Sequence, residues 1–237
     1  AFADYLTLPE GNLHLVPAAV TDEEAVFTEP LAAALQILEQ VHVHPTDSVI
    51  VLGDGKLGLL AAQVLLLTGC DVLVAGRHAG KLAVAAARGI PTALATELGE
   101  RRADVVVDCT GQPAGLELAR TLVHPRGTIV LKSTFHGTPA LALTPYVVDE
   151  VTIVGSRCGP FAPALRLLRN KQVAVQGLIS ATYALSDGVQ ASPKRTTVSK
   201  PAASAATSSR PSQPSCSASA SAAGTTTQPG CDSPGSA

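Results

Sequence analysis

Five short runs rich in Val, Ile and Leu recur along the chain, and a segment of helical length separates most of them. The runs cover residues 48–52, 71–75, 104–108, 127–132 and 150–154. Their apolar residues are continuous rather than alternating, which is typical of strands buried on both faces of a parallel sheet. Parallel strands need a crossover between them, usually a helix. The pattern therefore predicts an α/β fold built on a doubly wound parallel sheet.

Helical segments are predicted between and around these runs, at residues 29–40, 56–69, 81–88, 113–123 and 161–170. Ahead of the first of them, Thr21 is followed three residues later by Glu24, which predicts a capping box. Aromatic residues make up only 3% of the chain, so Val, Leu, Ile and Ala must fill the core. Residues 3–7 and 12–16, on either side of a Pro-Glu-Gly turn, predict two further short strands.

The composition changes sharply after Ala191. Residues 192–237 are almost entirely Ser, Ala, Thr, Pro and Gly with scattered charges. Such a segment buries too little apolar surface to offset the entropy lost on ordering. We therefore predict a disordered tail, in which Cys216 and Cys231 are exposed thiols.

A glycine-rich turn follows the first strand directly and precedes an apolar helix, which is the context a dinucleotide site requires. In the sequence Gly53-Asp54-Gly55-Lys56-Leu57-Gly58, the first glycine permits the tight turn and the second leaves room for a pyrophosphate. The third allows the helix to pack close to the sheet. The pyrophosphate would bind the free N–H groups near Lys56 and Leu57. The alternative interpretation is a glycine-rich turn without a ligand.

The tip of the second strand predicts which dinucleotide binds. An acidic residue there, about 20 residues beyond the glycines, reads the ribose of NAD. Here Gly76 takes that place and leaves room for a 2′-phosphate, which Arg77 could bind through charge-assisted hydrogen bonds. His78 and Lys81 would add positive charge. We predict NADP(H), with NAD(H) as the alternative; Arg77 could otherwise be a solvated loop residue.

The ends of the third and fourth strand runs complete the predicted cofactor site. Ligands of open α/β sheets bind beyond the carboxyl ends of the strands. Thr110, Gly111 and Ser133 follow those ends and are expected beside the nicotinamide half of the cofactor. Ordinary turn chemistry would also explain these three residues.

Charge and cysteine content narrow the classes of partner and compartment. The net charge of −2 gives no electrostatic reason to expect nucleic acid or an anionic membrane surface. The five cysteines form no CxxC pair, and Cys70, Cys109 and Cys158 lie in or beside apolar segments. This pattern favours structural thiols in a reducing compartment. With no signal peptide and no membrane span in the sequence, we predict a cytoplasmic protein.

An ordered series of motifs resembles the zinc-type medium-chain dehydrogenases, and within them the threonine, sorbitol and glucose dehydrogenase-like branch. The motifs are Ala1–Tyr5, Val20–Leu31 (which contains Phe27–Leu31), Gly53–Gly58, Asp108–Gly111 and Val151–Ser156. The resemblance implies that residues 29–170 form a Rossmann NAD(P)-binding domain. It also implies that residues 1–28 are a remnant of a GroES-like catalytic domain and that residues 171–191 return towards it. The family's Cys and His zinc ligands would lie upstream of Ala1, so we expect a chain truncated at its N-terminus.

Of the family's metal site, the resemblance leaves Glu29 alone, within Glu29-Pro30-Leu31. A helix-start carboxylate stabilised by the helix dipole is the alternative interpretation. One carboxylate is not a catalytic zinc site, which needs three protein ligands. His42 and His44 alternate along the chain and are expected to be structural or exposed, because no further ligand stands nearby.

The resemblance implies an oxidoreductase that transfers a hydride between NADP(H) and an alcohol or carbonyl substrate. Zinc would assist as a Lewis acid in the full-length family, although this chain is not expected to bind it. The alternative is an inactive NADP(H)-binding module or fragment. No catalytic residue is assigned. A small-molecule substrate is expected, and neither nucleic acid nor a membrane is expected as a partner. A homo-oligomer joined through the strand at Val151–Val154 is also expected.

Overall fold

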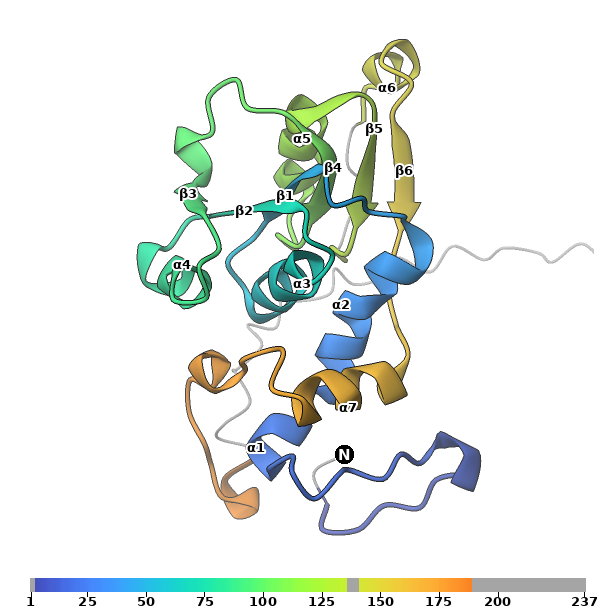
Figure 1. Ribbon diagram of the computed structural model, residues 1–237, viewed down its shortest axis with the longest axis vertical. Coiled ribbons are helices and arrows are strands. Elements are labelled where there is room, and N and C mark those ends of the chain that lie inside the picture. The colour runs from blue at the N-terminus through green and yellow to red at the C-terminus, as the bar shows by residue number, and fades with distance from the viewer. Residues whose placement is uncertain (1–2, 136–140, 189–237) are drawn as a thin grey trace, which may run out of the picture. The chain divides into compact units, whose positions relative to one another are not determined.

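The computed structural model describes residues 3–135 and 141–188. Its six described strands form one sheet in the order β3-β2-β1-β4-β5-β6, and every neighbouring pair is parallel (Figure 1). The strands are β1 (Ser48–Leu52), β2 (Asp71–Gly76), β3 (Thr92–Leu94), β4 (Ala103–Asp108), β5 (Val123–Leu131) and β6 (Thr152–Gly155). The α-helices are α1 (Asp22–Ala25), α2 (Thr28–Gln40), α3 (Lys56–Leu66), α4 (Ala79–Ala86), α5 (Pro113–Leu122), α6 (Thr144–Val148) and α7 (Phe161–Arg169).

The strand order confirms the predicted doubly wound sheet, the Rossmann architecture. From β1 the chain builds outward through β2 to β3, and it then crosses to β4 on the other side of β1. The direction of winding therefore reverses between β1 and β4. At their carboxyl ends, Leu52 lies opposite both Ala75 of β2 and Asp108 of β4. A ligand-binding crevice is expected at this point of an open α/β sheet.

Both faces of the sheet are covered, which explains why its strands are apolar without alternation. Val49 and Val51 point to one face, where they pack in a cluster with residues of α2, α3 and α7. Ile50 and Leu52 point to the other face and pack with residues of α5. Successive side chains of a strand face opposite sides, so two covered faces require every central residue of β1 to be apolar. Each such side chain contributes roughly 1.5–3 kcal/mol when fully buried.

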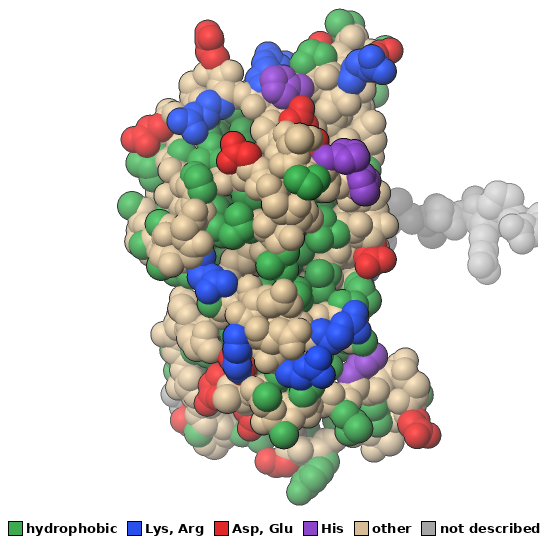
Figure 2. Space-filling view, in the orientation of Figure 1, with side chains coloured by type: hydrophobic (Ala, Val, Ile, Leu, Met, Phe, Trp, Pro, Cys, Tyr) green, Lys and Arg blue, Asp and Glu red, His purple; other side chains and the backbone are tan. Residues whose placement is uncertain are grey.

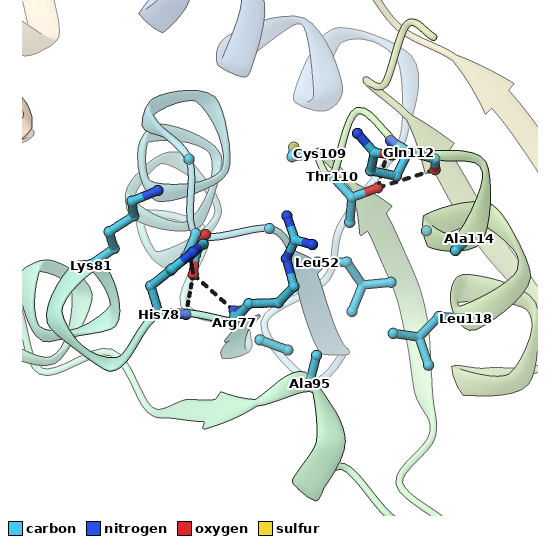
Figure 3. Close-up of a pocket in the computed structure, with 16 residues that line it drawn as sticks. Leu52, Arg77, His78, Lys81, Ala95, Cys109, Thr110, Gln112, Ala114 and Leu118 are labelled. Carbon is cyan, nitrogen blue, oxygen red and sulfur yellow. Dashed lines mark hydrogen bonds and ion pairs between the residues drawn. The ribbon is translucent and has the colours of Figure 1, made fainter. Parts of the chain in front are cut away.

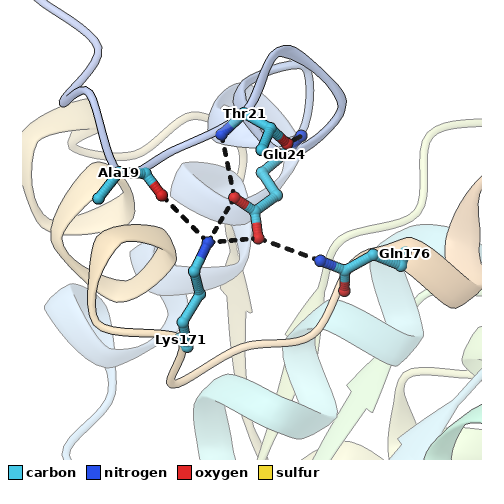
Figure 4. A network of polar contacts seen from close by, with 5 residues as sticks. All are labelled: Ala19, Thr21, Glu24, Lys171 and Gln176. Atoms are coloured by element: carbon cyan, nitrogen blue, oxygen red, sulfur yellow. Dashed lines mark hydrogen bonds and ion pairs between the residues drawn. The ribbon is translucent and has the colours of Figure 1, made fainter.

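The predicted capping box at Thr21 is present and forms part of a larger polar network (Figure 4). The Glu24 backbone N–H donates to Thr21 Oγ1 at 3.3 Å, and the Thr21 N–H donates to Glu24 Oε2 at 3.1 Å. Lys171 Nζ binds both carboxylate oxygens of Glu24, at 2.7 and 2.6 Å, and Gln176 donates to Oε1 at 3.0 Å. The network joins the segment around α1 to the loop that follows α7.

The prediction of two strands at residues 3–7 and 12–16 is wrong. The described part of this segment contains only a 3-10 turn, Glu10–Asn12, and extended residues without strand partners. Tyr5 and Leu15 are 94% and 96% exposed. A strand exists only where another strand accepts its hydrogen bonds, and residues 3–16 have no strand neighbour in the described structure.

Two short elements, β3 and α6, were not predicted, and β5 begins earlier than the apolar run suggested. The chain divides into two units, residues 1–191 and residues 192–237. The predicted disorder of the tail, with Cys216 and Cys231, lies outside the described residues. Helices long and apolar enough to cross a bilayer are absent from the described part of the chain. Acidic and basic side chains are interspersed on the face drawn in Figure 2.

Candidate cofactor site

The glycine-rich turn has the geometry that its three glycines predict. Gly53 has φ +118°, and a Cβ there would lie 2.8 Å from the Cys109 carbonyl oxygen. A Cβ on Gly58 would overlap the carbonyl of Gly53, so only glycine lets α3 start this close to the turn. Gly55 differs from both, because no atom of the described residues lies within 4 Å of the Cβ it lacks. The space beside Gly55 is therefore open.

Helix α3 presents free backbone donors to that space. The helix begins at Lys56, its N-cap Gly55 has no side chain to bond the first N–H groups, and the Leu59 N–H is the first to bond back to Gly55. The N–H groups of Lys56, Leu57 and Gly58 lie in the first turn, where helix N–H groups have no partner within the helix. Together with the helix dipole, such donors form a ready anion site.

A cavity of about 420 Å³ opens at this end of the sheet (Figure 3). It is bordered by the carboxyl ends of β1, β2 and β4 and by the start of α5. Of the residues predicted to bind cofactor, six line it directly: Gly53, Gly55, Arg77, His78, Lys81 and Thr110. Lys56, Leu57 and Gly58 follow at the start of α3. Nine of the eleven predicted residues thus lie at or directly beside this cavity.

The tip of β2 differs from the expectation that Gly76 leaves room for a phosphate. A Cβ on Gly76 would lie 2.5 Å from the Asp54 Cβ and 2.7 Å from Asp54 Oδ2. The space that the missing side chain vacates is taken by Asp54, the second residue of the glycine-rich turn. Sequence reasoning missed this residue, because the contact joins two strand tips and leaves no periodic signal in the chain.

Asp54 is held by the residues on which the cofactor prediction rests. Its Oδ2 accepts hydrogen bonds from the backbone N–H groups of Arg77 and His78, at 2.8 and 2.6 Å, and lies 2.9 Å from His78 Nδ1. Burial raises the pKa of Asp54, but the hydrogen bonds from His78 and Arg77 outweigh it, and the pKa is lowered overall. Asp54 is therefore a carboxylate at neutral pH.

The cationic side chains around Asp54 are exposed. Arg77 and Lys81 are exposed residues that line the cavity, and His78 is half exposed at its side chain. In Figure 3 the Arg77 side chain extends from the tip of β2 into the cavity. Among the described residues, the Arg77 guanidinium makes no ion pair.

The ends of β4 and β5 are built by local hydrogen bonds. Asp108 Oδ1 accepts from the Thr110 backbone N–H at 2.9 Å and from its hydroxyl at 2.7 Å. The Gly111 N–H donates to Ser133 Oγ at 2.8 Å, and Gly111 has φ +66°. This is the turn chemistry named as the alternative for these residues. Thr110 lines the cavity, whereas Gly111 and Ser133 do not line it and join the ends of β4 and β5 through their hydrogen bond.

Two further residues directly follow β4 and β5: Cys109, which the sequence predicted to be a structural thiol, and Lys132, which it did not single out. Burial raises the pKa of the Cys109 thiol to about 12, with a smaller contribution from Asp108, so Cys109 is a packed thiol rather than a nucleophile. Lys132 is only 7% exposed, and its Nζ binds the carbonyls of Ala33 and Arg157 at 2.6 and 2.9 Å. A lysine directly after an apolar strand run was the available signal for Lys132.

Glu29 does not gather metal ligands around it. It is exposed in the first turn of α2, and residues 3–135 and 141–188 contain no group of three His, Cys, Asp or Glu side chains that could hold a metal ion. The described residues therefore do not fit a catalytic zinc site, which takes three protein ligands. His42 and His44 are exposed and stack edge to face with ring centroids 4.3 Å apart. Cys158 is also exposed, contrary to the expectation of a packed thiol.

A parallel doubly wound sheet with a glycine-rich turn at its switch point defines a nucleotide-binding α/β protein. The family model described as zinc-binding dehydrogenase matches residues 57–170. The match covers just under half of the chain and lies within its nucleotide-binding part, and it confirms the resemblance to zinc-type medium-chain dehydrogenases. A sorbitol dehydrogenase of Halalkalibacterium halodurans is 29% identical over 79% of this chain and 60% of its own length.

Solved structures share the fold of this chain. An alcohol dehydrogenase of E. coli CFT073, solved with NADH, has a TM-score of 0.72 at 26% identity and is matched over 78% of this chain and 58% of its own length. A zinc-binding dehydrogenase of Sinorhizobium meliloti 1021, solved with NADP, has a TM-score of 0.74 at 22% identity, over 80% of this chain and 61% of its own. The chain thus spans about 60% of the length of these relatives.

Proposed function

We propose that this chain is the cofactor-binding part of an oxidoreductase that transfers a hydride between NADP(H) and an alcohol or carbonyl substrate. One observation carries the proposal. The open space beside Gly55 faces the first turn of an eleven-residue helix at the point where the winding of the sheet reverses. A dinucleotide's pyrophosphate fits that position in charge and size. The relatives named sorbitol and alcohol dehydrogenases support the reaction class.

The preference for NADP(H) rests on Arg77 and Lys81. Both are exposed cations that line the cavity at the tip of β2, and a 2′-phosphate would make charge-assisted hydrogen bonds with the Arg77 guanidinium. One structural relative was solved with NADP and another with NADH. In this proposal Thr110 borders the nicotinamide half, while Gly111 and Ser133 hold that border in place.

The remaining parts of the proposal concern the chain outside the cofactor site. Residues 29–170 form the cofactor domain, while residues 1–28 and 171–191 belong to a GroES-like catalytic domain. Zinc would belong to the full-length family and is not expected on this chain alone; Glu29 is the residue here that would lie near such a metal. The substrate is a small molecule, the location is cytoplasmic, and a second copy would pair along β6, whose Ile153 is 40% exposed.

Gly55→Val tests the cofactor site without disturbing the fold. Gly55 has the extended angles φ −78° and ψ 171°, which valine adopts freely, and nothing lies within 4 Å of the new Cβ. The added side chain would instead stand where the pyrophosphate binds. We expect NADPH binding, measured by its fluorescence, to weaken by about a hundredfold or more, since about 3 kcal/mol of pyrophosphate hydrogen bonds is lost.

Gly11→Val is the matched control, because Gly11 also has no atom within 4 Å of an added Cβ and lies outside the cavity. Both variants should melt within a few degrees of the parent chain. Equal NADPH affinity in Gly55→Val and in the parent would contradict the proposed pyrophosphate position. Absence of NADPH and NADH binding by the parent would overturn the proposed function itself.

A further inference from the structure

The chain carries an acidic residue at the tip of β2 after all, but supplies it from the neighbouring strand. Asp54 follows β1, yet its Cβ and Oδ2 occupy the space beside the Gly76 Cα. Gly76 is the last residue of β2 and is buried. The Asp54 carboxylate therefore fits at the tip of β2 only because residue 76 has no side chain.

The two oxygens of this carboxylate have different surroundings. Oδ2 is saturated by the backbone N–H groups of Arg77 and His78 and by the His78 ring. Oδ1 makes no hydrogen bond with any residue in the described ranges, and Asp54 lines the cavity. Asp54 is 8% exposed, so little solvent reaches it. One oxygen of a mostly buried carboxylate is thus left without a protein donor at the edge of the cavity.

Such an oxygen has a chemical preference between the two dinucleotides. An acid at the tip of the second strand accepts hydrogen bonds from ribose hydroxyls and repels a 2′-phosphate. Arg77 and Lys81 favour the phosphate from the same edge of the cavity, and His78 lies against the other oxygen of the carboxylate. Within one subsite, Asp54 therefore favours NAD(H), whereas Arg77 and Lys81 favour NADP(H).

We propose that Asp54 is a specificity-determining residue. Its free Oδ1 accepts a hydrogen bond from an adenosine ribose hydroxyl of NAD(H), and its negative charge limits the preference for NADP(H). This inference rests on the proposed function and refines its cofactor. The chain would accept both dinucleotides, with Arg77 favouring the phosphorylated one and Asp54 the other. Removal of the Asp54 charge should therefore shift the selectivity towards NADP(H), and removal of the Arg77 charge should shift it towards NAD(H).

The expected shift follows from the charges involved. A 2′-phosphate carries close to two negative charges at neutral pH, and a carboxylate about 5 Å away in a partly solvated site opposes it by enough to change affinity about tenfold or more. Loss of the ribose acceptor weakens NAD(H) binding in addition. When the Asp54 charge is removed, tighter NADP(H) binding and weaker NAD(H) binding both raise the ratio of the NAD(H) to the NADP(H) dissociation constant.

Asp54→Asn is the decisive variant, because an amide oxygen retains the hydrogen bonds from Arg77 and His78 while the charge is removed. Adenosine 2′,5′-bisphosphate and 5′-AMP serve as probes of this subsite, and NADP⁺ and NAD⁺ as complete cofactors, all measured by calorimetry. We expect Asp54→Asn to raise the Kd ratio of NAD⁺ to NADP⁺ about tenfold or more. Arg77→Gln should lower it.

Asp71→Asn is the matched control, since it removes the same charge from an exposed residue at the opposite end of β2. A ratio that stays within about twofold in Asp54→Asn, or an equal shift in Asp71→Asn, would overturn the inference. The proposed function would survive either result if the parent chain binds the cofactors. Should Asp54→Asn fail to fold, Asp54→Ser keeps an oxygen for the two N–H groups and allows the same measurement.

Discussion

At the residue scale, the site depends on what each glycine makes room for. Gly53 and Gly58 are required by the backbone around them, whereas no described atom requires a glycine at position 55, where the proposed pyrophosphate would bind. The sequence motif predicted all three, because a glycine-rich turn between strand and helix has a known geometry. It did not predict that Gly76 makes room for Asp54. That contact depends on how two strand tips face each other, and the sequence between them does not encode it locally.

Gly76→Ala should destabilise the chain by about 1–3 kcal/mol, because the new methyl group overlaps the Asp54 side chain and forces the strand tip to shift. Asp54→Gly in the same chain removes the overlap and should recover much of the loss. A double-mutant cycle of unfolding free energies measures the coupling directly. Additive effects of the two substitutions would contradict the close approach seen at this strand tip.

At the scale of elements, the long, continuous signals were predictable and the short ones were not. The limits of β1 were predicted to the residue, and α2, α3, α5 and α7 were each predicted within a few residues. β3 has three half-buried residues and no apolar run, so its place in the sheet comes from its pairing with β2. Residues 3–16 show the reverse case: a strand-like composition without a strand partner.

Lys132 joins several elements at the carboxyl end of β5. Its Nζ binds the Ala33 carbonyl in α2, Ser156 Oγ and the Arg157 carbonyl beyond β6, and burial lowers its pKa. We expect Lys132→Met to cost about 1–3 kcal/mol of stability in urea unfolding, because two buried carbonyls lose their donor. Lys81→Met, at an exposed lysine of α4, should be near neutral. A neutral or stabilising Lys132→Met would mean that burial of the charge offsets all three hydrogen bonds.

At the scale of the whole molecule, the Glu24–Lys171 ion pair joins two segments that are 147 positions apart in the sequence (Figure 4). The hydrogen bond from Lys171 and that from the Thr21 backbone lower the pKa of Glu24 below its ordinary value of 4.5. A lowered carboxyl pKa contributes stability that is complete above the unfolded value and is lost as the pH falls through the folded one.

Glu24→Gln should therefore melt at a lower temperature than the parent chain at neutral pH. The difference in melting temperature between parent and variant should narrow as the pH falls below about 4.5, because the parent then protonates the carboxylate that the variant lacks. Thermal melts from about pH 7 to pH 3 measure this gap. Glu23→Gln, at an exposed neighbour in α1, is the control and should show no such dependence. A gap that stays constant with pH would exclude the ion pair as its source.

The joint occupation of one space by Gly76 and Asp54 restricts how this subsite can be re-engineered. A designer who transplants an acid onto position 76 alone would crowd a carboxylate against another carboxylate, with steric and electrostatic penalties together. Moving the acid from turn to strand requires both positions to change at once, through an intermediate that either lacks the acid or carries two. With the role proposed for Asp54, cofactor preference would be a two-site trait, and libraries that vary one position at a time would miss its best solutions.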